Sequence, residues 1–134
     1  MEDFTPEQIL SITTGYITMA RALNEFQVNH WPELAHEQQL DLNAYQNSLL
    51  NRAQDLQMLN TRPAFVNTYA MEAMVREAIE KAKNGLHRMG NLTVALNTGA
   101  ITVALASYVA RANLRGIQTA LRELDELLLL KEEG

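Results

Sequence analysis

Cysteine is absent from the 134 residues, which excludes a disulfide scaffold, a thiolate metal site and a cysteine nucleophile. A Gly-x-Ser-x-Gly motif is also absent, and Gly85, Gly90 and Gly99 do not form a phosphate-binding loop. The N-terminal residues 1–6 are acidic and lack the basic start and apolar run of a secretory signal. We therefore expect a cytoplasmic, non-enzymatic protein that uses no cofactor.

Acidic residues are absent between Lys81 and Arg122, and inside that stretch residues 89–110 carry no formal charge of either sign. The net charge of −5 is therefore uneven: the chain carries −7 before this stretch, +6 within it and −4 after it. A long neutral segment flanked by cations must be buried, inserted into lipid, or matched to an acidic partner surface.

The N-terminal part predicts a helix over residues 6–28. Thr5 is a suitable N-cap, Pro6 suits the first turn, and Gln8 completes a capping box. Apolar residues then recur at alternating spacings of three and four, which indicates one buried stripe. The stripe consists of Ile9, Ile12, Tyr16, Met19, Leu23 and Phe26.

Two further helices are predicted in the middle of the chain. Pro32 disfavours helical geometry at the residue before it, so the second helix is expected over 33–59. A second break ending at Pro63 leads to a third helix over 63–84, and Gly85 follows as a residue able to adopt the left-handed cap conformation.

The C-terminal part predicts one long helix over residues 91–131. Its apolar seam alternates spacings of three and four without a slip. The seam consists of Ala100, Val103, Ser107, Ala110, Leu114, Ile117, Leu121, Leu124 and Leu128. Residues 89–99 also resemble a hairpin with a turn ending at Gly99, but an isolated two-stranded hairpin is marginal, so we favour helix there.

Three kinds of site have weak support in the sequence. Glu33-x-x-His36 has the spacing of a di-iron ligand pair, but the second such pair is missing, so a solvated helix start is the simpler interpretation. Because the chain as a whole is acidic, nucleic-acid binding by the six cations of the 81–122 stretch is not favoured. Residues 89–110 are long enough to span a membrane, but their asparagine, threonine and serine side chains offset the gain from the apolar ones.

We therefore predict an all-α fold: a single domain over residues 1–134, built as an antiparallel bundle of about four helices with a long C-terminal helix. The leading functional hypothesis is an assembly or adaptor protein that self-associates, as a homo-oligomer with a dimer favoured, or binds a protein partner through that helix. The candidate interface residues are Leu114, Ile117, Leu121, Leu124, Leu128, Arg111, Arg115 and Arg122.

Two alternatives stay open at this point. The chain could be a structural subunit of a larger helical assembly, such as a secretion filament, a rod or a phage component. It could also be a membrane-active helical protein that inserts residues 89–110. The sequence leaves open whether the cations of the 81–122 stretch face acids of their own chain or those of another.

Overall fold

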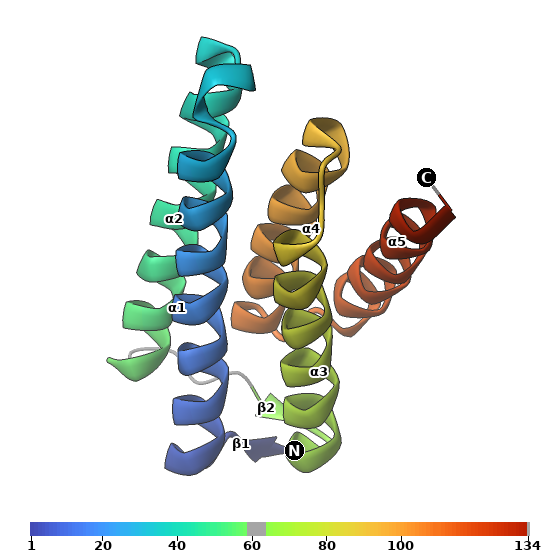
Figure 1. Cartoon of the computed structure of the whole chain (residues 1–134). Coiled ribbons are helices and arrows are strands. Elements are labelled where there is room, and N and C mark those ends of the chain that lie inside the picture. Colours follow the sequence, from blue (N-terminus) through green and yellow to red (C-terminus); the bar gives the residue numbers. More distant parts are fainter. Residues whose placement is uncertain (59–63, 134) are drawn as a thin grey trace.

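The computed structural model describes residues 1–58 and 64–133, with side chains described as far as Leu129. Within these residues the chain is almost entirely helical, which confirms the all-α class (Figure 1). The helices are α1 (Pro6–Asn29), a 3-10 helix (Trp31–Glu33), α2 (His36–Gln57), α3 (Thr68–His87), α4 (Leu92–Ala110) and α5 (Leu114–Glu133). Two short strands, β1 (Glu2–Asp3) and β2 (Ala64–Phe65), complete the elements.

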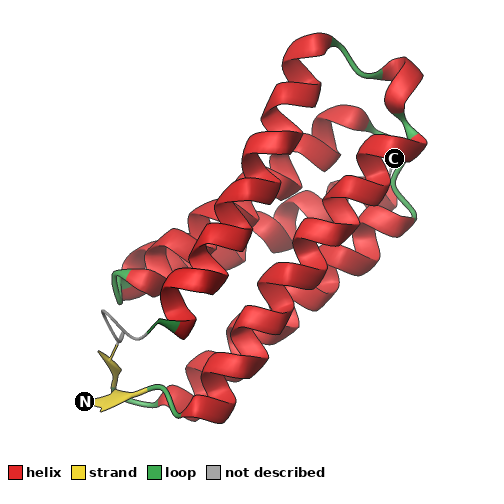
Figure 2. Ribbon diagram, turned by 90° about the vertical axis from the view of Figure 1, so that its left-hand side faces the viewer, coloured by secondary structure: helices red, strands yellow, loops and turns green. Residues whose placement is uncertain are grey.

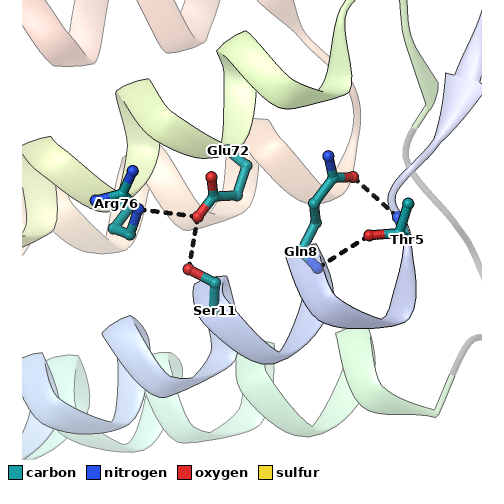
Figure 3. A network of polar contacts seen from close by, with 5 residues as sticks. All are labelled: Thr5, Gln8, Ser11, Glu72 and Arg76. Carbon is teal, nitrogen blue, oxygen red and sulfur yellow. Dashed lines mark hydrogen bonds and ion pairs between the residues drawn. The ribbon is translucent and has the colours of Figure 1, made fainter.

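The start of α1 is the predicted capping box. The Thr5 hydroxyl accepts from the Gln8 backbone N–H at 3.1 Å, and the Gln8 side chain accepts from the Thr5 N–H at 2.9 Å (Figure 3). All six residues of the predicted apolar stripe are buried. This helix agrees with the prediction because its start signals and its apolar period are both local properties of the sequence.

The helices pack in a definite order around one core. α1 lies between α2 and α3, α4 packs against α2 and α3, and α5 packs against α4 and α3. Figures 1 and 2 show α1 to α4 running alongside one another, whereas α5 leans away from α1 and α2. The residues that α4 contributes to this core are mostly small.

Two polar clusters connect α1 to its neighbours. Toward α3, the Ser11 hydroxyl donates to Glu72 at 2.6 Å, and Arg76 Nε donates to the same carboxylate oxygen at 3.0 Å (Figure 3). Toward α2, the buried amide of Gln27 donates to Asn43 at 3.1 Å. The Gln27 oxygen accepts from Gln46 at 2.7 Å. These directional contacts set the register in which α1 packs against both helices.

The strands were not expected from the sequence. Glu2 pairs with Phe65 and Asp3 pairs with Ala64 in an antiparallel register. The Phe4 and Phe65 rings pack with their centroids 5.3 Å apart. Because β2 occupies the segment expected to open the third helix, α3 begins at Thr68 instead of at residue 63. The predicted break at 60–63 lies outside the described residues.

The boundary between α3 and α4 differs from the prediction in one respect. Gly85 lies inside α3 and is buried, and Arg88 is the capping residue instead. A Cβ at Gly85 would lie 2.9 Å from a Leu128 methyl group, so this glycine serves close packing of α3 against α5. Residues 92–99 are helical, with the Asn91 side chain accepting from the Val94 N–H at 3.2 Å, so helix was correct and the hairpin wrong.

The long C-terminal helix predicted over residues 91–131 is wrong, because the chain breaks between Ala110 and Leu114 to give α4 and α5. Ala112 takes a left-handed conformation with φ of 51°. The Asn113 N–H donates to the Tyr108 carbonyl at 2.9 Å, and the Ala112 N–H donates to Val109 at 3.1 Å, which is the Schellman arrangement of a helix end. Asn113 then caps α5 by accepting from the Gly116 N–H at 3.0 Å.

Candidate functional site

The predicted interface residues do not form a single surface. Ile117 and Leu124 are 0% and 1% exposed, so they belong to the core of their own chain. Leu121 and Leu128 are half-buried against that core, and Leu114 is 50% exposed. The apolar face of α5 is therefore largely used within the molecule, since its seam packs against α4 and α3.

The cations of the 81–122 stretch divide into paired and exposed groups. Lys81 lies 3.9 Å from Asp125, and Lys83 lies 3.2 Å from Glu80, so these two face acids of their own chain. Arg111 donates to the Ser107 hydroxyl at 3.0 Å and lies 5.6 Å from the Tyr108 ring centroid.

The remaining two arginines of the predicted interface, Arg115 and Arg122, are exposed on α5. Neither arginine forms an ion pair with any residue that the structure describes. Within the 81–122 stretch, Arg88 is likewise exposed and forms no ion pair with a described residue, so Arg88, Arg115 and Arg122 are available to a partner, as is Arg111 apart from its contacts with Ser107 and Tyr108.

The outward face of α4 is an uncharged stripe of small side chains. Its members recur at spacings of three and four, which places them along one side of the helix, opposite the buried residues. We call this set the α4 stripe; it consists of Thr93, Asn97, Ala100, Ala104 and Ser107. Thr93 and Asn97 are exposed and the other three are half-buried, so the stripe is the part of the neutral segment between residues 89 and 110 that faces away from the core.

A groove lies on each side of the α4 stripe. The groove toward α5 has a volume of about 390 Å³ and is lined by Asn97, Ala100, Ile101, Glu123, Glu126 and Leu127. The groove toward α2 has a volume of about 380 Å³ and is lined by Ser48, Asn51, Arg52, Asp55, Val103, Ala104 and Ser107. Four of the five stripe residues line these grooves, so the stripe is part of the groove walls, a surface against which a second helix can pack.

Ala100 and Ser107 belong to the predicted apolar seam, but the other stripe residues and the two glutamates were missed because that seam was followed through α4 and α5 as one helix. The sequence did contain a signal for this surface. In a helix with this many small residues, the positions outside the buried face also carry no charge. A helix face without charged side chains loses little hydration when another molecule covers it. The α4 stripe is therefore a candidate contact surface.

A separate cavity lies deeper in the molecule, between α1, α2 and α4, with a volume of about 160 Å³. Tyr16 lines it, is buried, and has a hydroxyl without a hydrogen-bond partner among the described residues. A buried hydroxyl without a partner costs about 1–3 kcal/mol. Burial raises the pKa of the Tyr16 phenol far above its ordinary value, and the positive charge of Arg52 partly opposes that rise.

The histidines and acids show no metal cluster in the part of the chain that the structure describes. His36 is exposed and begins α2, whereas Glu33 belongs to the preceding 3-10 helix. Glu33 lies 3.2 Å from His30. The Glu33-x-x-His36 spacing therefore does not place a ligand pair on one α-helix.

One helix among the described residues, α4, is long and apolar enough to cross a membrane, with a mean hydropathy of 1.5. Only 39% of that segment is buried inside the molecule. A helix in the core of a water-soluble protein can satisfy the same criterion, so the finding by itself does not distinguish the two environments.

Comparisons of the chain with protein families, with curated proteins and with solved structures found no match.

Proposed function

We propose that this chain is a non-enzymatic helical assembly protein that forms a two-fold dimer through the α4 stripe and its flanking grooves. In this proposal, α1 to α4 form an antiparallel bundle, and α5 packs on the side of that bundle made by α3 and α4. The observation that supports it most directly is the uncharged α4 stripe with opposite charges near its two ends.

The small side chains allow a second helix to approach closely. Ala100 and Ala104 are four residues apart on the exposed side of α4, and Ser107 continues the same row. Helices whose contact faces carry such residues can bring their backbones near one another, and the ridge of one helix then fits the grooves beside the other. The α4 stripe of a second copy therefore fits between α2 and α5.

The charges favour an antiparallel arrangement of the two copies. Arg111 follows the last residue of α4, and Arg115 lies in the first turn of α5 beside it. Glu123 and Glu126 lie near the other end of the stripe, in the groove that contains Asn97. When two copies pack with their α4 helices antiparallel, the arginines of each copy come near the glutamates of the other.

This arrangement replaces the contact expected from the sequence. The proposed dimer retains Arg111 and Arg115 from the predicted interface but uses the uncharged α4 stripe in place of the α5 seam. Leu124→Glu is consequently a poor test of association, because a charge at a residue that is 1% exposed would disrupt the fold itself.

The direct test is the mass of the protein by analytical ultracentrifugation over the micromolar range, with substitutions on the α4 stripe. Ala104→Glu places a charge at the centre of the proposed contact and is expected to give monomer with unchanged helicity. Thr14→Glu, on the exposed side of α1, is the matched control and is expected to leave the dimer intact. A monomeric wild-type protein, or a dimer that tolerates Ala104→Glu, would contradict the proposal.

A charge exchange tests the orientation of the dimer. Arg111→Glu is expected to raise the dissociation constant about tenfold, and adding Glu126→Arg is expected to restore most of the affinity, since the two side chains face each other across the two-fold axis. Loss of affinity without restoration would exclude the antiparallel arrangement. A mass that keeps rising with concentration would indicate an open-ended helical assembly instead of a closed dimer.

Insertion of α4 into a membrane is the second candidate, supported by the length and hydropathy of that helix. Flotation with vesicles containing anionic lipid distinguishes it from dimerisation in water. In a lipid environment the Asn97 and Ser107 side chains on the α4 stripe would lose their hydrogen bonds to water without gaining new partners, which is unfavourable.

A further inference from the structure

The cavity between α1, α2 and α4 has the features of a small-molecule site. Its volume of about 160 Å³ is comparable to that of cavities, near 150 Å³, that can hold a molecule the size of benzene. It is lined by Tyr16 from α1, by Arg52, Asp55 and Leu56 from α2, and by Ala106, Val109 and Ala110 from α4. This lining combines the polar side chains of Tyr16, Arg52 and Asp55 with four apolar ones.

Tyr16 supplies the buried polar group. The residue is 1% exposed, and the described part of the chain provides no hydrogen-bond partner for its hydroxyl. Arg52, which also lines the cavity, is the charged side chain that acts on this phenol. Tyr16 and Arg52 line the same cavity, and the unpaired Tyr16 hydroxyl can donate one hydrogen bond to a group bound there.

Arg52 and Asp55 supply two opposite charges one helical turn apart. Neither side chain forms an ion pair or a hydrogen bond with another residue that the structure describes. Asp55 is exposed and Arg52 is half-buried, so the charges stand at the solvent side of the cavity, above the apolar part formed by Leu56 and Val109. The formal charge of the lining is zero, which disfavours a ligand with a net charge.

We propose that this cavity binds a small zwitterion with a short branched apolar body, the chemistry of an aliphatic α-amino acid. The carboxylate accepts from the Arg52 guanidinium and the Tyr16 hydroxyl, and the ammonium group donates to the Asp55 carboxylate. The aliphatic body packs against Leu56, Ala106 and Val109. This site adjoins the dimer contact proposed above, because the groove between the α4 stripe and α2 shares Arg52 and Asp55 with it.

The probes are three compounds with one carbon skeleton: L-valine, isovalerate, which lacks the ammonium group, and isobutylamine, which lacks the carboxylate. Titration followed by amide NMR is suited to the millimolar affinity expected of so small a ligand. We expect L-valine to shift amides of α1, α2 and α4 around the cavity and to bind at least about tenfold more tightly than either partial analogue. Equal binding of L-valine and isovalerate, or no binding of L-valine, would overturn the proposal.

Three variants locate the binding. Tyr16→Phe keeps the ring but removes the hydroxyl and is expected to weaken L-valine binding about five- to tenfold. Asp55→Asn is expected to remove the preference for L-valine over isovalerate, because the partner of the ammonium group loses its charge. Tyr45→Phe is the matched control, since Tyr45 lies beside Gly99 and does not line the cavity. An unchanged affinity in Tyr16→Phe would also overturn the proposal.

The same titration on Arg111→Glu, which is expected to weaken the dimer, separates the two proposals of function. Arg111 lines neither the cavity nor the groove that shares Arg52 and Asp55 with it, so L-valine is expected to bind this variant at least as tightly as it binds the wild type. Binding without dimerisation would refute the assembly proposal alone, and dimerisation without binding would refute the cavity proposal alone.

Discussion

Gly116 lies where α5 comes closest to the Tyr108 ring at the end of α4, and Gly116→Ala tests how this corner is packed. A Cβ at this position would lie 2.5, 2.6 and 2.8 Å from Cδ1, Cγ and Cε1 of Tyr108. Cγ cannot move by rotation of the ring about its own axis, so the whole side chain must change its χ1 rotamer or the helices must separate.

The magnitude follows from two opposing contributions. Alanine in place of glycine inside a helix ordinarily stabilises by about 1 kcal/mol. Overpacking of this kind costs about 1–3 kcal/mol, and displacing the Tyr108 ring also removes its contact with Arg111, which is worth about 0.5 kcal/mol. Because three ring atoms are too close, we place the cost near its upper end and expect a net loss of about 1–2 kcal/mol.

Urea unfolding followed by circular dichroism measures this loss, which corresponds to a fall in Tm of about 4 °C per kcal/mol. Gly90→Ala is the control, because nothing lies within 4 Å of a Cβ at Gly90, and its effect is expected to be within a few tenths of a kcal/mol. In a Tyr108→Ala background, Gly116→Ala is expected to become stabilising by about 1 kcal/mol. Stabilisation of the wild type by Gly116→Ala would refute the packing described for this corner.

Two further predictions concern buried polar groups. Gln27→Ala is expected to lower the free energy of unfolding by about 2 kcal/mol, because it leaves the amides of Asn43 and Gln46 without their partner. A loss below about 0.5 kcal/mol in urea unfolding would contradict this prediction. Burial raises the pKa of Tyr16, so above about pH 10 the folded chain keeps a proton that the unfolded chain releases. The free energy of unfolding is therefore expected to fall as the pH rises further, by at most about 1.4 kcal/mol per pH unit. Thermal unfolding across an alkaline pH series checks this. Tyr16→Phe has no titratable hydroxyl at this position, so its Tm should fall less steeply with pH.

The sequence predicted best where the signals are local. The capping box and the apolar stripe of α1 lie within a few residues of one another, so both the start and the buried face of this helix were predicted correctly. The helical state of residues 92–99 was also predicted correctly, because an isolated two-stranded hairpin would be marginal.

The break between α4 and α5 was missed because it carries neither glycine nor proline. Ala112 takes the left-handed position that glycine usually fills, at a cost of about 1–2 kcal/mol. The available signal was Asn113, a residue suited to an N-cap. The three-four spacing continues across the break because each helix buries one face, so the period alone could not distinguish one helix from two.

The candidate sites depend on contacts between helices that no period reveals. Tyr16 was correctly predicted to be buried, but the cavity beside it needs Arg52 from α2 and Val109 from α4. The assignment of Leu124 to an interface followed from the expected long helix; once α5 folds back, that side chain packs into its own chain.

The pairing of β1 with β2 has a consequence for the rate of folding. It joins segments about sixty residues apart, and closing so long a loop costs more entropy than forming the contacts between α1 and α2, which follow one another in the chain. The strands are therefore expected to pair after α1 and α2 have associated, late on the folding pathway. Contacts that form so late slow unfolding without speeding folding. The pairing of β1 with β2 is therefore expected to lengthen the lifetime of the folded chain.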